Sequence, residues 1–385
     1  MNRRFFLTAA GATGLAAPSA SQAVATRSLG PGLLVAAVDA PAAEKRVAAY
    51  RCDGVADQEQ IQAAIASLGS NGGQVQLSSG TFFLTDAVRL TNRVLLSGRG
   101  RATSLRAAGT WTSFDGARQG ALIESATNSV DKAGVSHLAL DGARYQGHDI
   151  GGIYFNTTSN ADFDEGPDAA NWFSDLYIFH TRQHGVHFAG SRGRATKASR
   201  IRVYNVGQEG VNVAHGFLID TPDGTYDQLE SGSASGAGFW VDGTNNRFTN
   251  CKAWYSDLSG WEIRKGRCMF SACESQDNEQ HGFYIGAGPN SLTGCHADSN
   301  SWNGDSPTSA YDGFHIPWGN DIQLVGCSAY DKNEGGRGYW QRHGFYVGSS
   351  ANRIQILGTA RDNASDGLTG PGVDNADNTM LVAST

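Results

Sequence analysis

A four-residue pattern of glycine, apolar, variable and apolar residues recurs along the chain from residue 150 onward. Apolar residues at alternate positions, bounded by turn residues, are typical of short β-strands that bury one face. Where it is most regular the repeat is 22 residues long, too short for a strand–helix–strand unit, so it predicts one coil of a parallel β-helix. The repeated glycines are Gly152, Gly185, Gly210, Gly238, Gly260, Gly282, Gly313 and Gly344.

A second column of residues precedes these glycines and changes from leucine and isoleucine to cysteine. Because cysteine packs as a small apolar residue, we expect buried, stacked free thiols. The count of six cysteines keeps a disulfide framework open as the alternative. A metal site is disfavoured, since no Cys-x-x-Cys occurs. The column reads Leu176, Ile201, Leu229, Cys251, Cys273, Cys295, Cys327 and Thr359.

The stretch after residue 50 predicts a helix followed by strands. Asp57 is placed to cap the helix, and Gly72 and Gly73 end it. Alternation from Gln74 to Leu84 predicts strands packed against it. The apolar face of the helix carries Ile61, Ala64, Ile65 and Leu68.

Two segments of this region resemble the N-terminal cap and first coil of the pectate-lyase-like superfamily. They run from Cys52 through Asp57 to Ile65, and from Gly72 to Phe83. The resemblance implies an all-β fold, a right-handed parallel β-helix (solenoid) with an N-terminal capping helix. It implies no specificity, because the superfamily includes lyases, glycoside hydrolases, transferases and noncatalytic proteins.

The N-terminus resembles a twin-arginine export signal. Arg3 and Arg4 precede an apolar stretch that ends at a small-residue cleavage site, Ser21-Gln22-Ala23. We therefore expect a secreted or periplasmic protein. The expected parts are a signal peptide (1–23), a linker or irregular cap (24–50) and a β-helix domain (51–385), itself divided into cap and first coil (51–100), irregular coils (101–149) and regular coils (150–382).

Composition narrows the function classes. Hydrophobic residues make up 40% of the chain and aromatic residues 10%, which excludes wholesale disorder. No apolar run reaches the roughly 20 residues of a membrane helix. The net charge of −7, more negative still without the two signal arginines, argues against a nucleic-acid partner.

The variable residue of the repeated pattern alternates with buried neighbours, so it should point to solvent. This outward column is rich in aromatic rings, imidazoles and carboxylates, the composition of a sugar-binding groove. Asp242 and Arg264 follow two residues later on the same face. The predicted column is Tyr154, His187, Asn212, Trp240, Glu262, Tyr284, His315 and Tyr346.

Two long insertions, residues 296–312 and 328–343, lengthen the same turn on successive coils. Such insertions often build the wall of a binding face. They contribute further candidates for substrate binding, namely Trp302, Arg337, Trp340 and His343. A third loop, 157–171, is acidic; it predicts either a solvated loop or a Ca²⁺ site, and no other cofactor is expected.

Glycoside hydrolysis or transfer needs two carboxylates across the scissile bond. Asp242 and Glu262 lie on adjacent coils and are the candidate pair. The alternative is that Asp242 forms a surface ion pair with Arg264. Hydrolysis or transfer on a polysaccharide or oligosaccharide is the first interpretation.

Two other functions stay open. A polysaccharide lyase would use Arg264 to neutralise a uronate carboxylate and His315 or Tyr284 to remove the C5 proton. A noncatalytic glycan-binding β-helix would use the aromatic residues alone. The sequence does not decide the sugar, the linkage or the oligomeric state.

Overall fold

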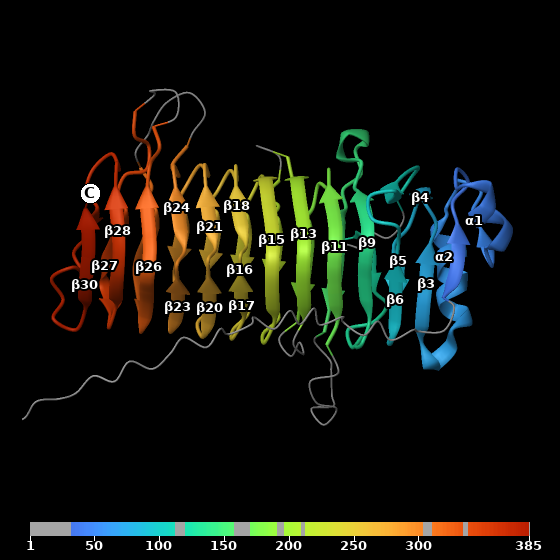
Figure 1. Cartoon of the computed structure of the whole chain (residues 1–385), viewed down its shortest axis with the longest axis horizontal. Coiled ribbons are helices and arrows are strands. Elements are labelled where there is room, and N and C mark those ends of the chain that lie inside the picture. The colour runs from blue at the N-terminus through green and yellow to red at the C-terminus, as the bar shows by residue number, and fades with distance from the viewer. Residues whose placement is uncertain are drawn as a thin grey trace, which may run out of the picture. The chain divides into compact units, whose positions relative to one another are not determined.

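The computed structural model is a right-handed parallel β-helix whose strands form two long sheets (Figure 1). It describes residues 32–111, 120–157, 170–190, 196–208, 212–302, 310–333 and 338–384. Like positions of successive coils pair in register, as between Trp240 and Glu262 and between Cys268 and Asn290. The fold class inferred from the sequence is confirmed.

Sheet A has 19 strands. They are β1 (Leu33–Ala36), β2 (Tyr50–Arg51), β3 (Gly73–Leu77), β4 (Gly80–Leu84), β6 (Val94–Ser97), β7 (Thr103–Ala107), β9 (Gly134–Asp141), β11 (Trp172–Phe179), β13 (Lys197–Val206), β15 (Thr225–Ala234), β17 (Arg247–Thr249), β18 (Lys252–Trp254), β20 (Cys268–Ser271), β21 (Glu274–Gln276), β23 (Asn290–Thr293), β24 (His296–Asp298), β26 (Ile322–Tyr330), β28 (Gln355–Arg361) and β30 (Thr379–Ser384).

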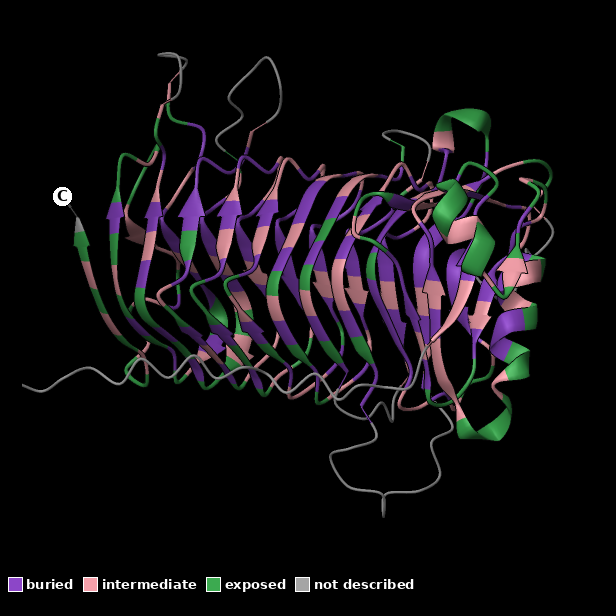
Figure 2. Cartoon of the chain, turned by 45° about the vertical axis from the view of Figure 1, so that its right-hand side comes forward, coloured by how far each residue is buried: buried purple, intermediate pink, exposed green. Residues whose placement is uncertain are grey.

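Sheet B has 11 strands and contains the repeated glycine pattern. They are β5 (Val88–Leu90), β8 (Ala121–Ser125), β10 (Gly151–Asn156), β12 (Val186–Ala189), β14 (Phe217–Ile219), β16 (Phe239–Val241), β19 (Trp261–Ile263), β22 (Phe283–Ile285), β25 (Phe314–Asn320), β27 (Phe345–Asn352) and β29 (Leu368–Thr369). Buried and half-buried residues alternate along many strands (Figure 2).

The interior of sheet B holds a ladder of stacked aromatic rings. Phe239 and Trp261 stack with centroids 4.0 Å apart, and Phe283 and Phe314 follow at 4.8 Å. The glycine before each ring leaves room for the opposite wall: a Cβ at Gly260 would lie 2.0 Å from Ser275 Oγ. The repeated glycines are therefore required by close approach inside the coil.

The cysteines form the predicted interior ladder. All six are free and buried, and no disulfide forms. Cys273, for example, lies in the core cluster between the coils of Cys251 and Cys295. The column does not continue to Thr359, because a register shift after Val325 pairs Cys327 with Gly358.

Reductant is therefore expected to leave the melting temperature unchanged, since no cross-link contributes to the folded state. Calorimetric scans with and without dithiothreitol measure this. Thiol titration should detect all six cysteines only after denaturation, because each is buried. A fall in melting temperature on reduction would contradict the free-thiol ladder.

The N-terminal end carries two helices, α1 (Ala42–Val47) and α2 (Gln58–Ser67), shown at the blue end of Figure 1. Short 3₁₀ turns, η1 and η2, lie at Gly69–Asn71 and Arg144–Gln146. The predicted helix is present, with the side chains of Ile61, Ala64 and Ile65 buried.

Asp57 does not cap α2 as predicted. Its carboxylate instead accepts hydrogen bonds from the backbone N–H groups of Gly54, at 2.9 Å, and Phe83, at 2.8 Å. It therefore joins the preceding loop to β4. The segment 24–50 also holds more structure than an irregular cap, because β1 pairs with both β2 and β3.

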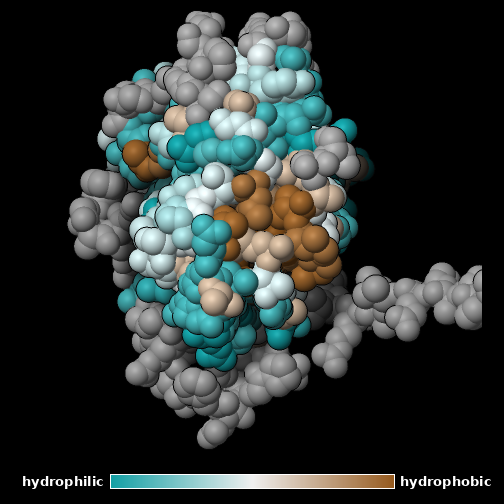
Figure 3. Space-filling model, turned by 90° about the vertical axis from the view of Figure 1, so that its left-hand side faces the viewer, coloured by the Kyte–Doolittle hydropathy of each residue, from teal (hydrophilic) through white to brown (hydrophobic). Residues whose placement is uncertain are grey.

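Regular stacking begins before residue 150. Strand β9, within the segment expected to be irregular, pairs in register with β11 from Gly134 to Asp141. Among the described residues, no helix is long and apolar enough to cross a membrane. Figure 3 shows apolar residues gathered on the C-terminal end of the solenoid. On the last two strands of sheet A, β28 and β30, Leu357 and Leu381 are exposed.

Candidate functional site

The outward column of sheet B is real, with one substitution. Strand pairing aligns eight residues on successive coils, here called the outer stripe: Tyr154, His187, Leu218, Trp240, Glu262, Tyr284, His315 and Tyr346. The stripe keeps every predicted member except Asn212. Leu218 takes that place because the strand is opened by Gly216 instead of Gly210.

Asn212 lies outside the stripe, in an isolated bridge with Gln208. Its side-chain carbonyl accepts a hydrogen bond from the Gln208 N–H at 3.0 Å, and its amide group donates to the Arg182 carbonyl. The Asn212 side chain therefore stabilises nearby backbone, and it does not lie with the stripe residues that could bind substrate.

A second line of side chains runs beside the stripe, and sequence reasoning identified only its last member, His343, as a candidate. These residues, the inner column, directly precede the glycines and join coil to coil, as in the hydrogen bond from Gly282 N to Asp312 O. The sequence does contain a signal for this column, because the residue before the repeated glycine is most often histidine. The inner column is His184, His215, Ala237, Ser259, His281, Asp312 and His343.

Arg264 lies at the centre of the stripe. Its guanidinium stands 4.7 Å from the ring centroids of both Trp240 and Tyr284. Its Nη2 atom lies 2.7 Å from Glu262 Oε2. The two rings and the carboxylate therefore fix a cation whose side chain remains 34% exposed.

Glu262 is covered, although it belongs to the outward column. Only 5% of the residue is exposed. Burial raises the pKa of Glu262 above its ordinary value, and the Arg264 charge offsets part of that effect. The carboxylate is thus positioned beneath Arg264 instead of projecting into solvent.

Asp242 and Arg264 do not form the predicted ion pair. The carboxylate of Asp242 is exposed and lies 3.5 Å from Lys265 Nζ. Arg264 turns to Glu262 because residues 262 and 264 share the outer face of one coil. The candidate carboxylate pair for hydrolysis therefore has each member next to its own cation.

A buried aspartate organises the C-terminal half of the site. Asp312 has no exposed surface. Its Oδ2 atom lies 2.7 Å from His315 Nδ1, and its Oδ1 atom lies 2.8 Å from His343 Nδ1. Arg342 donates to both oxygens, at 2.9 and 2.8 Å. Three side chains from two coils thus converge on one carboxylate.

These contacts fix the protonation of the cluster. Burial alone would raise the pKa of Asp312, but hydrogen bonds from His315 and Arg342 outweigh it and hold that pKa well below the ordinary range. The carboxylate is therefore ionised and accepts the Nδ1 proton of His315. The Nε2 atom of a neutral His315 is then free of hydrogen and can accept a proton.

Rings stack along this half of the stripe. His315 stacks on His281 at 4.0 Å and on Tyr346 at 4.6 Å, and it lies 5.7 Å from the Tyr284 ring. Burial raises the pKa of Tyr284, with Glu262 adding to this effect and Arg264 opposing it. The Tyr284 phenol is accordingly neutral and carries its proton.

The donor set of His281, Asp312 and His315 is close enough for a metal ion, since its ligand atoms lie within 4.8 Å of one another. The surroundings do not favour one. Arg342 already occupies both oxygens of Asp312, and His281 Nδ1 accepts the Asp312 N–H at 3.0 Å. A cation would have to displace the guanidinium that is paired with this buried carboxylate.

The insertion residues divide between two places. His343 joins the Asp312 cluster, whereas Trp302 and Trp340 pack against each other, 6.1 Å apart, and Trp302 packs on Tyr255. Trp340 is buried, so it is a packing residue and not a substrate platform. Arg337 and the acidic residues Asp162, Asp164, Glu165 and Asp168 lie outside the described residues.

The other half of the stripe also carries a histidine bonded to a carboxylate. His187 Nε2 lies 2.8 Å from Asp220 Oδ2, and Tyr154 packs edge-on at 5.1 Å. His184 stacks on His215, which stacks on Trp240 at 4.8 Å. The predicted substrate-binding position of His187 thus continues the line of rings toward Arg264.

His215 is expected to make the fold sensitive to acid. Burial lowers the pKa of His215 to about 4, with a smaller contribution from His187. The unfolded chain takes up this proton near pH 6.5, so the free energy of unfolding falls as pH drops below that value. The contribution of His215 to the free energy of unfolding should fall by about 2 kcal/mol between pH 7.5 and pH 5.

Urea unfolding at the two pH values tests this prediction. His215→Phe keeps a ring for stacking but removes the titrating group, so its stability difference between the two pH values should be smaller by that amount. An equal difference in wild type and variant would contradict the assignment. The comparison uses the pH difference alone, so a uniform loss of stability in the variant does not affect it.

Comparison with protein-family models gives no match, and comparison with curated proteins gives none either. Solved structures do match. The A-module of the Azotobacter vinelandii mannuronan C-5 epimerase AlgE6 has a TM-score of 0.59 at 14% identity, covering 86% of this chain and 96% of that one.

Phage proteins match as well. The enzymatically active domain of bacteriophage CBA120 tailspike protein 2 has a TM-score of 0.61 at 15% identity, covering 82% of this chain and 49% of that one. The gp42 tailspike of Acinetobacter phage vb_AbaP_AS12 has a TM-score of 0.54 at 10% identity, covering 85% and 60%. At such identities the likeness establishes the fold.

Proposed function

We propose that this chain is an exported enzyme that acts on a polysaccharide along the outer stripe, by β-elimination at a uronic acid unit. The observation that carries the proposal is the placement of Arg264, Tyr284 and His315 in one stacked line, with Asp312 holding His315. Elimination needs a cation, an acid and a base in such proximity.

Arg264 is the group that would bind the uronate carboxylate. A guanidinium presents several N–H donors in one plane, and contact with Glu262 uses only part of them. Stacking on Trp240 and Tyr284 holds that plane in place before substrate arrives. Neutralising the carboxylate makes the adjacent C5 proton more acidic.

His315 is the base and Tyr284 the acid. The imidazole takes the C5 proton at Nε2, because Nδ1 is bonded to Asp312. The C5–H bonding electrons form the C4=C5 double bond as the C4–O bond breaks. The leaving oxygen takes the proton of the Tyr284 phenol, which its raised pKa keeps protonated. Each proton and electron pair is thereby accounted for.

Two further points support this proposal. One neighbour in fold is named for action at C-5 of mannuronan, and removal of the C5 proton begins both epimerisation and elimination. The N-terminal segment with Arg3 and Arg4, which lies outside the described residues, is the basis for proposing twin-arginine export.

Glycoside hydrolysis is the second candidate, because Glu262 is buried with a raised pKa, as a general acid requires. Its weakness is the partner carboxylate: Asp242 is exposed beside Lys265. A hydrolase would therefore act with one carboxylate covered and the other on the open surface.

Product analysis distinguishes the candidates. The protein is incubated with a panel of acidic and neutral polysaccharides, and products are followed by ultraviolet absorbance and by reducing-end assay. We expect an absorbing, unsaturated uronate from an acidic polymer. New reducing ends without that absorbance would support hydrolysis and contradict elimination, and glycan binding without any product would indicate a noncatalytic protein.

A further inference from the structure

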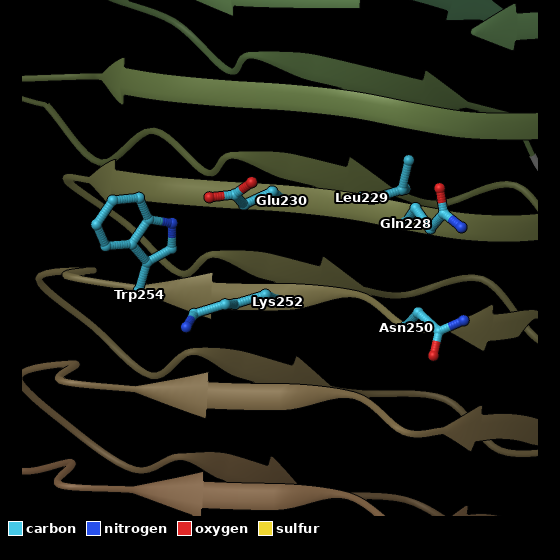
Figure 4. Close-up of a pocket in the computed structure, with 6 residues that line it drawn as sticks. All are labelled: Gln228, Leu229, Glu230, Asn250, Lys252 and Trp254. Carbon is cyan, nitrogen blue, oxygen red and sulfur yellow. The ribbon is translucent and has the colours of Figure 1, made fainter. Parts of the chain in front are cut away.

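Sheet A carries a hollow of about 310 Å³ on the outer face of β15, β17 and β18 (Figure 4). None of its lining residues belongs to the outer stripe or the inner column. It forms where the long strand β15 lies against a coil that is broken into two short strands by a bend at Asn250. Its lining residues are Gln228, Leu229, Glu230, Asn250, Lys252 and Trp254.

An aromatic platform stands at one end of the hollow. Trp254 is half-buried, and its ring lies beside Gly232 of the neighbouring strand. A Cβ at Gly232 would come within 2.9 Å of Trp254 Cε2 and 2.8 Å of Tyr204 Cδ2. The glycine therefore lets the two rings approach each other, with centroids 5.9 Å apart.

The fold makes no use of the polar atom of this indole. Trp254 Nε1 is buried and has no hydrogen-bond partner among the described residues. Packing next to Gly232 would be served equally by an apolar ring, so the choice of tryptophan is not explained by the coil alone. Large aromatic faces on an open sheet are suited to stacking on sugar rings.

Polar groups flank the platform with their charges already matched. Glu230 Oε2 lies 2.6 Å from Arg202 Nη2, and Lys252 Nζ lies 3.0 Å from Glu274 Oε1. Figure 4 shows Glu230 and Lys252 near Trp254, and the amides of Gln228 and Asn250 at the other end. Hydrogen-bonding groups without net charge suit an uncharged, hydroxyl-rich ligand.

We propose that this hollow is a second saccharide-binding site, distinct from the outer stripe and specific for a neutral sugar unit stacked on Trp254. It complements the stripe, where Arg264 favours an acidic sugar. The inference does not rest on the elimination chemistry, because a neutral glycan would bind here whatever reaction the stripe performs.

Calorimetric titration with cellohexaose, mannohexaose and hexamannuronate tests the proposal in a His315→Ala background that prevents turnover. We expect at least one neutral hexasaccharide to bind, and Trp254→Ala to weaken that binding about tenfold or more. Trp254→Phe keeps a ring beside Gly232 and should show a smaller loss. Trp172→Ala removes an exposed tryptophan elsewhere on sheet A and should leave binding unchanged.

Three outcomes would overturn the inference: no neutral hexasaccharide binds, Trp254→Ala binds as tightly as its parent, or only hexamannuronate binding depends on Trp254. Circular dichroism of each variant shows whether it is folded. Release of unsaturated uronate by otherwise wild-type protein carrying Trp254→Ala is measured separately. Loss of the sugar-binding effect and loss of elimination activity are thereby distinguished.

Discussion

Replacing His315 with alanine is expected to lower kcat for the elimination reaction by about a thousandfold, the order of a lost general base. The imidazole is the one group of the stripe whose Nδ1 atom is bonded to the buried Asp312 while its ring stacks toward Tyr284. The initial rate of unsaturated-uronate release at saturating substrate measures the loss.

His187→Ala is the matched control. His187 occupies the same column and is also bonded to a carboxylate, that of Asp220. It is remote from the proposed acid, however: three strands of sheet B, β14, β16 and β19, separate its strand β12 from β22, which carries Tyr284. Its loss should raise KM and change kcat little. If both variants lower kcat equally, the loss is not specific to His315, and His315 is not the base.

Periodicity alone predicts most of the stripe. The 22-residue repeat places Trp240, Glu262 and Tyr284 in one column, and the recurring glycine pattern adds His315 and Tyr346 beyond the insertions. Alternation also correctly predicts that the neighbours of the stripe residues, such as Trp261 and Ile263, are buried, because successive side chains of a strand point to opposite faces.

The same repeat would have avoided the error at Asn212. Gly216 lies one 22-residue period before Gly238, whereas Gly210 only imitates the pattern with Val211 and Val213. A local match of glycine and apolar residues is weaker evidence than spacing, since stacking of coils is what imposes the column.

Contacts between columns could not be obtained from the pattern. The choice of Glu262 over Asp242 by Arg264 depends on side-chain direction within one coil. The Asp312 cluster depends on Arg342 and His343, which an insertion of variable length brings back to the same corner. Periodicity sets which backbone positions stack, while the conformation of turns decides which charges meet.

Replacement of Arg264 is expected to give the second large loss of activity. Arg264→Ala should lower kcat/KM on a uronate polymer by at least a hundredfold, because the cation that stabilises the developing negative charge is lost. Arg264→Lys restores the charge but not the plane that stacks between Trp240 and Tyr284, so it should recover only part of the activity. Steady-state rates across substrate concentrations separate the effects on kcat and KM.

Comparison with Glu262→Gln decides between the two candidate reactions. In elimination Glu262 orients Arg264, and glutamine can still accept a hydrogen bond from the guanidinium, so kcat should fall only about tenfold. In hydrolysis Glu262 donates the proton, so the same variant should lose activity more completely than Arg264→Lys. A greater loss in Glu262→Gln than in Arg264→Ala would therefore rule out the elimination mechanism, since a group that only positions Arg264 cannot matter more than Arg264 itself.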